Sequence, residues 1–146
     1  METGLKHFHS FFAYAVLLLV AVAVINAILA RNNGKRPFAG NGRKLALFGL
    51  IAAHVQLLFG IALYLHSPVG LHSFSGANMG NSMARLYMLE HPLMMIIGVV
   101  LITMGWSKAK KAADDRGKYG AVALWYGIGL VLLLSRIPWA VWPVGA

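Results

Sequence analysis

The chain contains no cysteine. Disulfides, thiolate metal sites and cysteine-bound iron–sulfur clusters are therefore excluded within this chain, as is covalent haem attachment through a Cys-x-x-Cys-His motif. If the chain binds haem, the haem must be held non-covalently, as haem b is.

Charged residues are also scarce, at 12% of 146 residues, whereas 59% of the residues are hydrophobic. Soluble domains carry about 25% charged residues, and a membrane-spanning helix needs about 20 predominantly apolar residues. Four segments reach that length, over residues 8–30, 44–66, 84–106 and 119–139, and leave little chain for anything else. We therefore predict an all-α fold in which residues 1–146 form a single integral membrane four-helix bundle.

The net charge of +9 is concentrated in two connections between the predicted spans. Each connection holds five basic residues: Arg31, Lys35, Arg36, Arg43 and Lys44 in the first, and Lys108, Lys110, Lys111, Arg116 and Lys118 in the second. Both connections fall on the same side of the bilayer, and the positive-inside rule assigns that side to the cytoplasm. Both termini then face the outer, periplasmic side. This distribution indicates anionic lipid headgroups as partners and no nucleic acid.

Two of the six histidines, His54 and His91, lie deep within predicted spans. At about 1.5 Å per residue, His54 is about 15 Å from Lys44, and His91 about 22 Å from Trp106. Ionisable groups inside a membrane are costly and usually functional. Because bundle cofactor sites are built from side chains on facing helices, we predict that His54 and His91 bind one haem iron.

His9 is the alternative axial ligand and the alternative partner of His91. It lies about 31 Å from Ala30 on the same helical count, which places it at the outer interface. Another metal site, a proton or quinone site, and histidines that simply hydrogen-bond across helices are the remaining interpretations. One haem b is expected. A second would need His9 together with an outward ligand such as His66 or His72.

Three further residues are candidates for cofactor binding. Gly98 lies seven residues after His91, on almost the same helical face, where it leaves room either for a porphyrin edge or for close helix packing. Arg85 and Arg136 lie near the outer side and suit haem propionates, although long cationic side chains also extend to the interface without a specific partner. Glu90 can exchange a proton or pair with Arg85.

Several short strings resemble those of small four-helix bacterial membrane proteins labelled cytochrome b or cytochrome b-like. They are Gly4-Leu5 with His7, His9-Ser10 and Tyr14, Ala53-His54-Val55-Gln56-Leu57, Arg85-Leu86 with Glu90-His91 and Met94-Met95, Ser107-Lys108-Ala109-Lys110-Lys111, and Ile137-Pro138-Trp139. The resemblance implies a b-type haem protein of the bacterial cytoplasmic (inner) membrane, with His9, His54 and His91 as the matching histidines.

The expected function is one-electron transfer through haem b, linked to the quinone pool, by a carrier or redox subunit rather than a stand-alone enzyme. Other redox subunits or a second copy of the chain are candidate partners. Two other functions fit the same residues. One is a non-haem structural or assembly subunit of a larger membrane complex. The other is a small proton-handling transporter that uses His54, His91 and Glu90.

Overall fold

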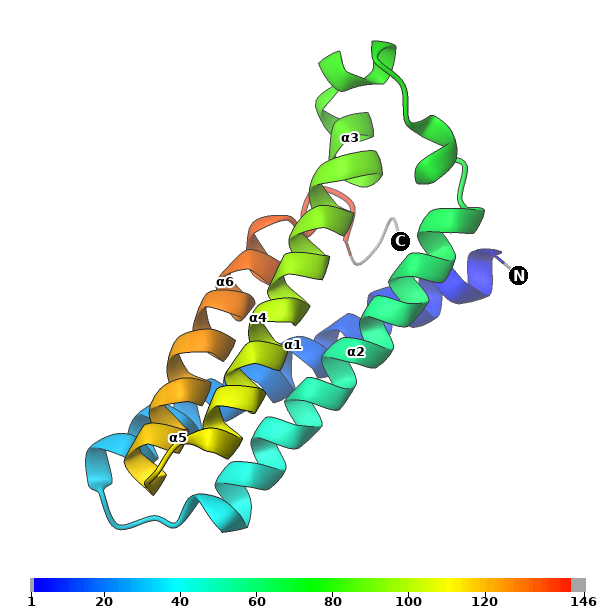
Figure 1. Ribbon diagram of the computed structural model, residues 1–146. Helices are drawn as coiled ribbons and strands as arrows, with labels where there is room; N and C mark the ends of the chain where they lie inside the picture. Colours follow the sequence, from blue (N-terminus) through cyan, green and yellow to red (C-terminus); the bar gives the residue numbers. More distant parts are fainter. Residues whose placement is uncertain (1, 143–146) are drawn as a thin grey trace.

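The computed structural model describes residues 2–142, and within this range the chain is helical apart from short connections (Figure 1). Four helical rods are long and apolar enough to cross a membrane: Glu2–Asn33, Phe38–His66, Ser82–Lys111 and Asp115–Ser135. The predicted all-α architecture is confirmed for the described residues. The first three rods contain the predicted spans.

The first rod is a single helix, and the other three are composite. Helix α1 covers Glu2–Asn33, and the second rod joins the π-helical turn η1 (Phe38–Gly42) to α2 (Arg43–His66). Two short 3-10 turns, η2 (Leu71–Ser73) and η3 (Ala77–Gly80), follow. The third rod comprises α3 (Ser82–Arg85), the π-helical turn η4 (Leu86–Glu90) and α4 (His91–Lys111). The fourth comprises α5 (Asp115–Ala121), the π-helical turn η5 (Val122–Tyr126) and α6 (Gly127–Ser135).

The fourth rod ends at Ser135, four residues before the predicted end of that span. Arg136 leaves the helix with φ −129° and ψ 24°. Pro138 cannot donate a helical hydrogen bond and disfavours helical backbone at the residue before it, which explains the early end. The chain then turns back towards α1, where the Trp142 indole Nε1–H donates to the Ser10 carbonyl at 3.1 Å.

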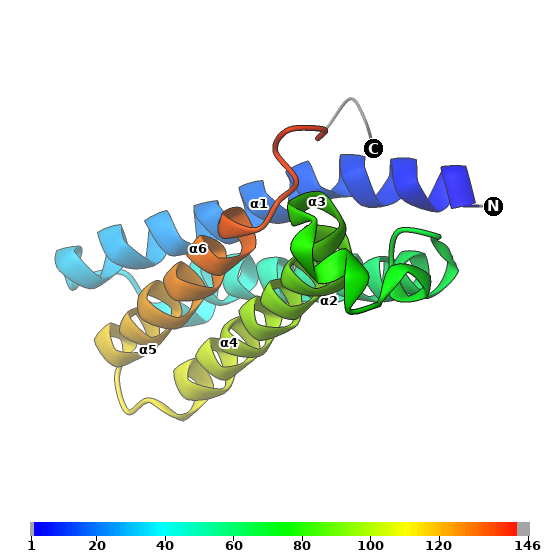
Figure 2. The same cartoon turned by 90° about the horizontal axis from the view of Figure 1, so that it is seen from above.

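The two basic connections lie at one end of the bundle, and the beginning of α1 lies at the other end, together with the α2–α3 connection and the segment after α6 (Figures 1 and 2). This arrangement follows from four rods that alternate in direction. It separates a basic end, formed by residues 31–44 and 108–118, from an end with few charges, near which His9 and His91 lie.

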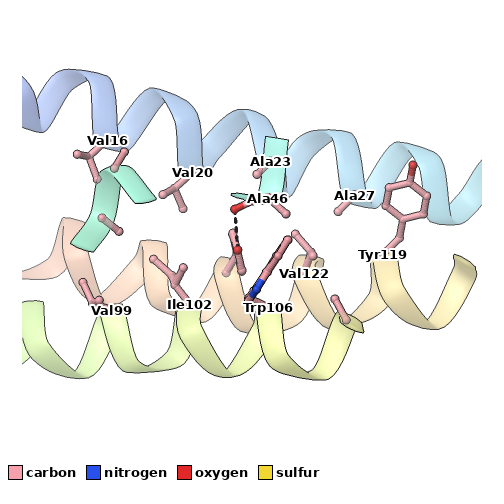
Figure 3. Close-up of a cluster of buried hydrophobic side chains, with 14 of the residues drawn as sticks. Val16, Val20, Ala23, Ala27, Ala46, Val99, Ile102, Trp106, Tyr119 and Val122 are labelled. Atoms are coloured by element: carbon pink, nitrogen blue, oxygen red, sulfur yellow. Dashed lines mark hydrogen bonds between the residues drawn. The ribbon is translucent and has the colours of Figure 1, made fainter. Parts of the chain in front are cut away.

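The core of the bundle is built from small side chains at alternating spacings of three and four residues. On α1 these are Val16, Val20, Ala23, Ala27 and Ala30, all buried. Such spacing is typical of coiled-coil seams, and the small side chains let helix backbones approach closely. Figure 3 shows several of these residues facing α4 and the fourth rod.

Tyr126 fills the centre of this core. Its side chain is fully buried, and its hydroxyl donates a hydrogen bond to the Ala46 carbonyl at 2.8 Å, the dashed line in Figure 3. The ring lies beside Gly49 of α2 and Gly105 of α4; a Cβ atom added at Gly105 would come within 2.9 Å of Tyr126 Cδ1. The two glycines therefore provide the space in which one tyrosine joins three helices.

Replacing Gly105 with alanine tests this packing. The new methyl group would lie 2.7 Å from Trp125 Cβ, so α4 and η5 would have to separate. We expect the free energy of unfolding to fall by about 1–3 kcal/mol, the usual cost of overpacking, seen as a lower thermal midpoint in detergent. Gly127→Ala is the control, because its Cβ would meet only Val24 at 3.9 Å. Equal midpoints for the two variants would contradict this account of the core.

Candidate functional site

His91 begins α4, between the π-helical turn η4 and Pro92. Proline has no backbone N–H, so the Met88 carbonyl, four residues earlier, loses its usual helical donor. The Tyr64 hydroxyl of α2 donates to that carbonyl at 2.8 Å. This hydrogen bond satisfies the freed carbonyl and ties α2 to the turn that precedes His91. Single π-helical turns of this kind are frequent at functional sites.

The imidazole of His91 is oriented by the chain segment that follows α6. Its Nδ1 lies 2.7 Å from the Arg136 carbonyl oxygen, and since a carbonyl only accepts, Nδ1 carries the proton and donates. In the neutral ring, Nε2 therefore has a free lone pair. Histidines that ligate metals almost always donate the other ring N–H in this way, which fixes both tautomer and orientation.

His9 of α1 lies opposite His91. The two ring centroids are 6.2 Å apart and the ring planes are inclined at 83°. The His9 Nδ1 atom is buried and has no hydrogen-bond partner. Gly60 of α2 leaves room for this ring, because a Cβ atom there would lie only 2.9 Å from His9 Cε1. A buried polar atom without a partner is uncommon and calls for an explanation.

Both imidazoles line one cavity of about 500 Å³, which is within the roughly 300–1,000 Å³ range of small-molecule and cofactor sites. Its walls come from α1, α2, the beginning of the third rod and the segment after α6, and most of its lining is apolar. Gln56 also lines it: its Nε2 donates to the His9 carbonyl at 2.8 Å, whereas its Oε1 is buried without a partner. The cavity thus combines apolar walls with a few convergent polar atoms, the usual composition of a ligand site.

The spacing of the two imidazoles suits a shared metal ion. Imidazole nitrogens bind metals at about 2 Å, and two rings whose centroids lie 6.2 Å apart are close enough for one nitrogen of each to bind the same ion. Within residues 2–142, no group of three or more His, Asp or Glu side chains gathers as a metal site would require. A haem iron needs no such group, because the porphyrin supplies its other four ligands.

His54 does not join this site. It is exposed on α2, its Nδ1–H donates to the Leu50 carbonyl at 2.8 Å, and its Nε2 lies 3.4 Å from Thr103 Oγ1. Thr103 follows His91 by 12 residues on α4, which is about 18 Å along the helix. The expected pairing of His54 with His91 is therefore not met. The alternative pair, His9 with His91, is the one that the fold brings together.

Arg85 and Arg136 bind the same carboxylate. Arg85 Nε donates to Glu90 Oε1 at 2.7 Å, and Arg136 Nε lies 3.3 Å from Glu90 Oε2. Arg85 also donates to the Met79 carbonyl at 2.8 Å. Neither arginine lines the cavity, whereas Lys6 does. In the structure the two arginines form an ion-pair network with Glu90 beside His91, and their role as propionate partners stays a prediction.

Gly98 serves helix packing rather than a porphyrin edge. A Cβ atom at this position would lie 2.9 Å from Leu133 Cδ2 and 3.2 Å from the Gly129 carbonyl oxygen, both on α6. Gly98 does not line the cavity. Of the two interpretations that the sequence left open for this glycine, the structure supports close contact between α4 and α6.

Three residues of the site were not predicted to belong to it: Gln56, Gly60 and Tyr64. A signal for the first two is present in the sequence. Ala46, Gly49, Ala53, Gln56 and Gly60 follow one another at spacings of three, four, three and four residues. Such a stripe marks one face of a helix. Gln56 and Gly60 therefore extend the packed face of α2, and His54 lies off it.

Comparison of the chain with protein-family models, with curated protein sequences and with solved structures gives no match. Function must therefore be inferred from the site itself.

Removal of the Tyr64 hydroxyl tests how the site is held. In Tyr64→Phe the Met88 carbonyl loses the donor that replaces its helical partner, which should lower the free energy of unfolding by about 1–3 kcal/mol. Thermal unfolding in detergent measures the effect. Tyr14→Phe is the matched control, because the Tyr14 ring contacts Trp142 in a tilted arrangement, and its hydroxyl makes no side-chain hydrogen bond among the described residues. Equal stability of the two variants would show that the Tyr64 bond does not support the turn.

Proposed function

We propose that the protein is a multi-pass membrane cytochrome of the b type, which transfers single electrons through one haem b held by His9 and His91. The observation that carries this proposal is the pair of imidazoles whose ring centroids lie 6.2 Å apart within one largely apolar cavity. The three-residue and longer clusters that other metals use do not occur among residues 2–142. The haem itself would supply a one-electron redox centre, with a potential that depends on its axial ligands, hydrogen bonds and burial.

The surrounding residues have definable roles. The Arg136 carbonyl holds the His91 ring in the tautomer whose Nε2 can bind a metal. Gly60 admits the His9 ring. A metal bond to His9 would offset the cost of burying an imidazole that has an unpartnered nitrogen. The apolar walls would keep water from the iron and so favour electron transfer over ligand exchange.

Two imidazole ligands also define what the protein would not do. With both His9 and His91 holding it, the haem would supply one-electron transfer rather than a binding site for oxygen or another substrate. An electron carrier or a redox subunit is therefore a better description than a stand-alone enzyme. Exchange of electrons with the quinone pool, with other redox subunits or with a second copy of the chain is part of the proposal.

The proposed location is the cytoplasmic (inner) membrane of a bacterium. Four rods of sufficient length and apolar character support a multi-pass protein. The two basic connections lie at one end of the bundle (Figure 1), and the positive-inside rule places that end in the cytoplasm. Both termini and the His9–His91 cavity would then lie towards the periplasmic side.

The other two functions receive less support. A structural subunit would be expected to use its buried histidines for hydrogen bonds across helices, but His9 Nδ1 has no such partner. A proton relay would need connected groups. Glu90 is held by Arg85 and Arg136, and His54 lies on a different part of the bundle, bonded to Leu50.

A reduced-minus-oxidised visible spectrum of the chain, purified in detergent after expression with ample haem, tests the proposal. We expect the sharp α-band of a six-coordinate b-type haem at one haem per chain. His9→Ala and His91→Ala should lose the band because each removes an axial ligand. His54→Ala and His66→Ala should keep it, since both residues are exposed and bonded within α2.

Two results would contradict the proposal. If the chain is well folded but colourless, it binds no haem. The cytochrome function is then rejected, and the structural-subunit function is favoured. If the α-band is lost in His54→Ala but kept in His9→Ala, the cytochrome function stands, but His9 and His91 are not the ligand pair.

Gly60→Val tests the placement of His9 without altering a ligand. The valine Cβ would lie 2.9 Å from His9 Cε1, so the ring must leave its position. Disturbing the support of a metal ligand costs about tenfold or more in affinity, and we expect at least that loss in haem retained through purification. Gly127→Val places the same side chain on a helix away from the cavity. Equal haem content in the two variants would show that Gly60 does not position His9.

A further inference from the structure

A second polar pair, His54 and Thr103, lies where α2 contacts α4, on a face that no other described part of the chain covers. His54 is exposed and Thr103 is half-buried. The apolar side chains one turn away are exposed as well: Ile51 and Leu58 on α2 and Val100 on α4. His54 is about 15 Å from Lys44 along the helix, close to the middle of a ~30 Å hydrocarbon layer. In a membrane, this pair would face lipid tails.

Both His54 Nε2 and Thr103 Oγ1 are hydrogen-bond acceptors, and neither receives a donor from the other. His54 Nδ1–H donates to the Leu50 carbonyl at 2.8 Å, so Nε2 of the neutral ring has only a lone pair. The Thr103 hydroxyl donates its single proton to the Val99 carbonyl at 2.8 Å. His54 Nε2 and Thr103 Oγ1, 3.4 Å apart, are therefore both acceptors. A second proton on His54 would supply a donor, but a charge at mid-bilayer is costly.

The molecule that completes this pair must bring a hydrogen-bond donor into the hydrocarbon layer. Lipid tails have none. A second copy of the chain does not supply one either. A two-fold interface pairs the same surface patch of both copies, and the patch around His54 and Thr103 otherwise presents the apolar Ile51, Leu58 and Val100. A lipid-soluble molecule with a hydroxyl group on an apolar body meets the requirement.

We propose that His54 and Thr103 form a binding site for the hydroxyl group of a membrane quinol, with the exposed Ile51, Leu58 and Val100 against its apolar parts. This inference rests on the proposed electron transfer and names its small-molecule partner. The site is separate from the His9–His91 cavity, since neither His54 nor Thr103 lines that cavity. The step assigned here is binding alone: the quinol O–H donates to the His54 Nε2 lone pair, with Thr103 Oγ1 as the neighbouring acceptor.

Imidazole nitrogen NMR of the isotope-labelled full chain in phosphatidylcholine nanodiscs tests the site directly. The probe is a decyl-substituted benzoquinol, and its dimethyl ether, which has no O–H, is the control ligand. We expect the quinol to shift the His54 Nε2 signal saturably and the ether to leave it unchanged. Thr103→Val should weaken quinol binding about fivefold, the equivalent of one ordinary hydrogen bond. His54→Leu should abolish the saturable binding.

His66→Leu is the matched control variant. His66 is exposed on the same helix and makes the same intrahelical bond, from Nδ1–H to the Ala62 carbonyl at 2.8 Å. Unlike His54, it has no threonine hydroxyl within hydrogen-bond distance among the described residues. It should bind quinol as the wild type does. Equal binding of the ether and the quinol, or equal affinities of His54→Leu and His66→Leu, would overturn the site. The site would also be overturned if the quinol did not shift the His54 Nε2 signal of the folded wild type. That result would favour a partner helix as the donor.

The haem content of the same samples separates this inference from the proposed function. His54→Leu should retain haem while losing quinol binding. A chain that binds haem but not quinol overturns the quinol site alone. A chain that binds quinol through His54 but lacks haem overturns the cytochrome and leaves the site in place.

Discussion

Close contact between helix backbones, made possible by alanine and glycine, is the constraint on which the rest of this structure depends. In a membrane the lipid is as apolar as a leucine side chain, so helices associate through van der Waals packing rather than through exclusion of water. Gly49 of α2 and Gly105 of α4 leave space for the buried Tyr126 ring and its bond to Ala46. The bundle is therefore tightly packed at its basic half.

The same helical faces position the candidate site. His9 lies seven residues before Val16, His91 lies seven before Gly98, and Gly60 lies seven after Ala53. Seven residues are two helical turns, so each of these residues continues a packed face towards the other end of the bundle. There the side chains no longer fill the space between the rods, and the cavity of about 500 Å³ remains. The same seven-residue spacing thus places the residues of the packed core and those of the cavity on the same helix faces.

Hydropathy and charge were sufficient to predict four apolar helices and their alternating order, because both depend on segment length and composition. The end of the fourth rod was not predicted, since Arg136 and Pro138 end the helix locally while the surrounding sequence stays apolar. For the histidines, counting residues gave a depth along each helix but not the direction around it. In the structure His54 lies off the packed face of α2 and beside Thr103, about 18 Å along α4 from His91. The stripe through Ala46, Gly49 and Ala53 indicates which face of α2 is packed. The hydrogen bond from His91 to the Arg136 carbonyl depends on the turn after α6, which no local sequence pattern indicates.

The proposal that His9 and His91 hold one haem is tested most directly by low-temperature electron paramagnetic resonance of the oxidised, haem-loaded chain. The two ring planes are inclined at 83°. Nearly perpendicular imidazoles on a ferric haem give a low-spin signal of strong axial anisotropy, whereas parallel imidazoles give an ordinary rhombic one. We expect the strongly anisotropic signal. A high-spin signal, as from iron with one histidine ligand, or a rhombic low-spin signal would contradict it.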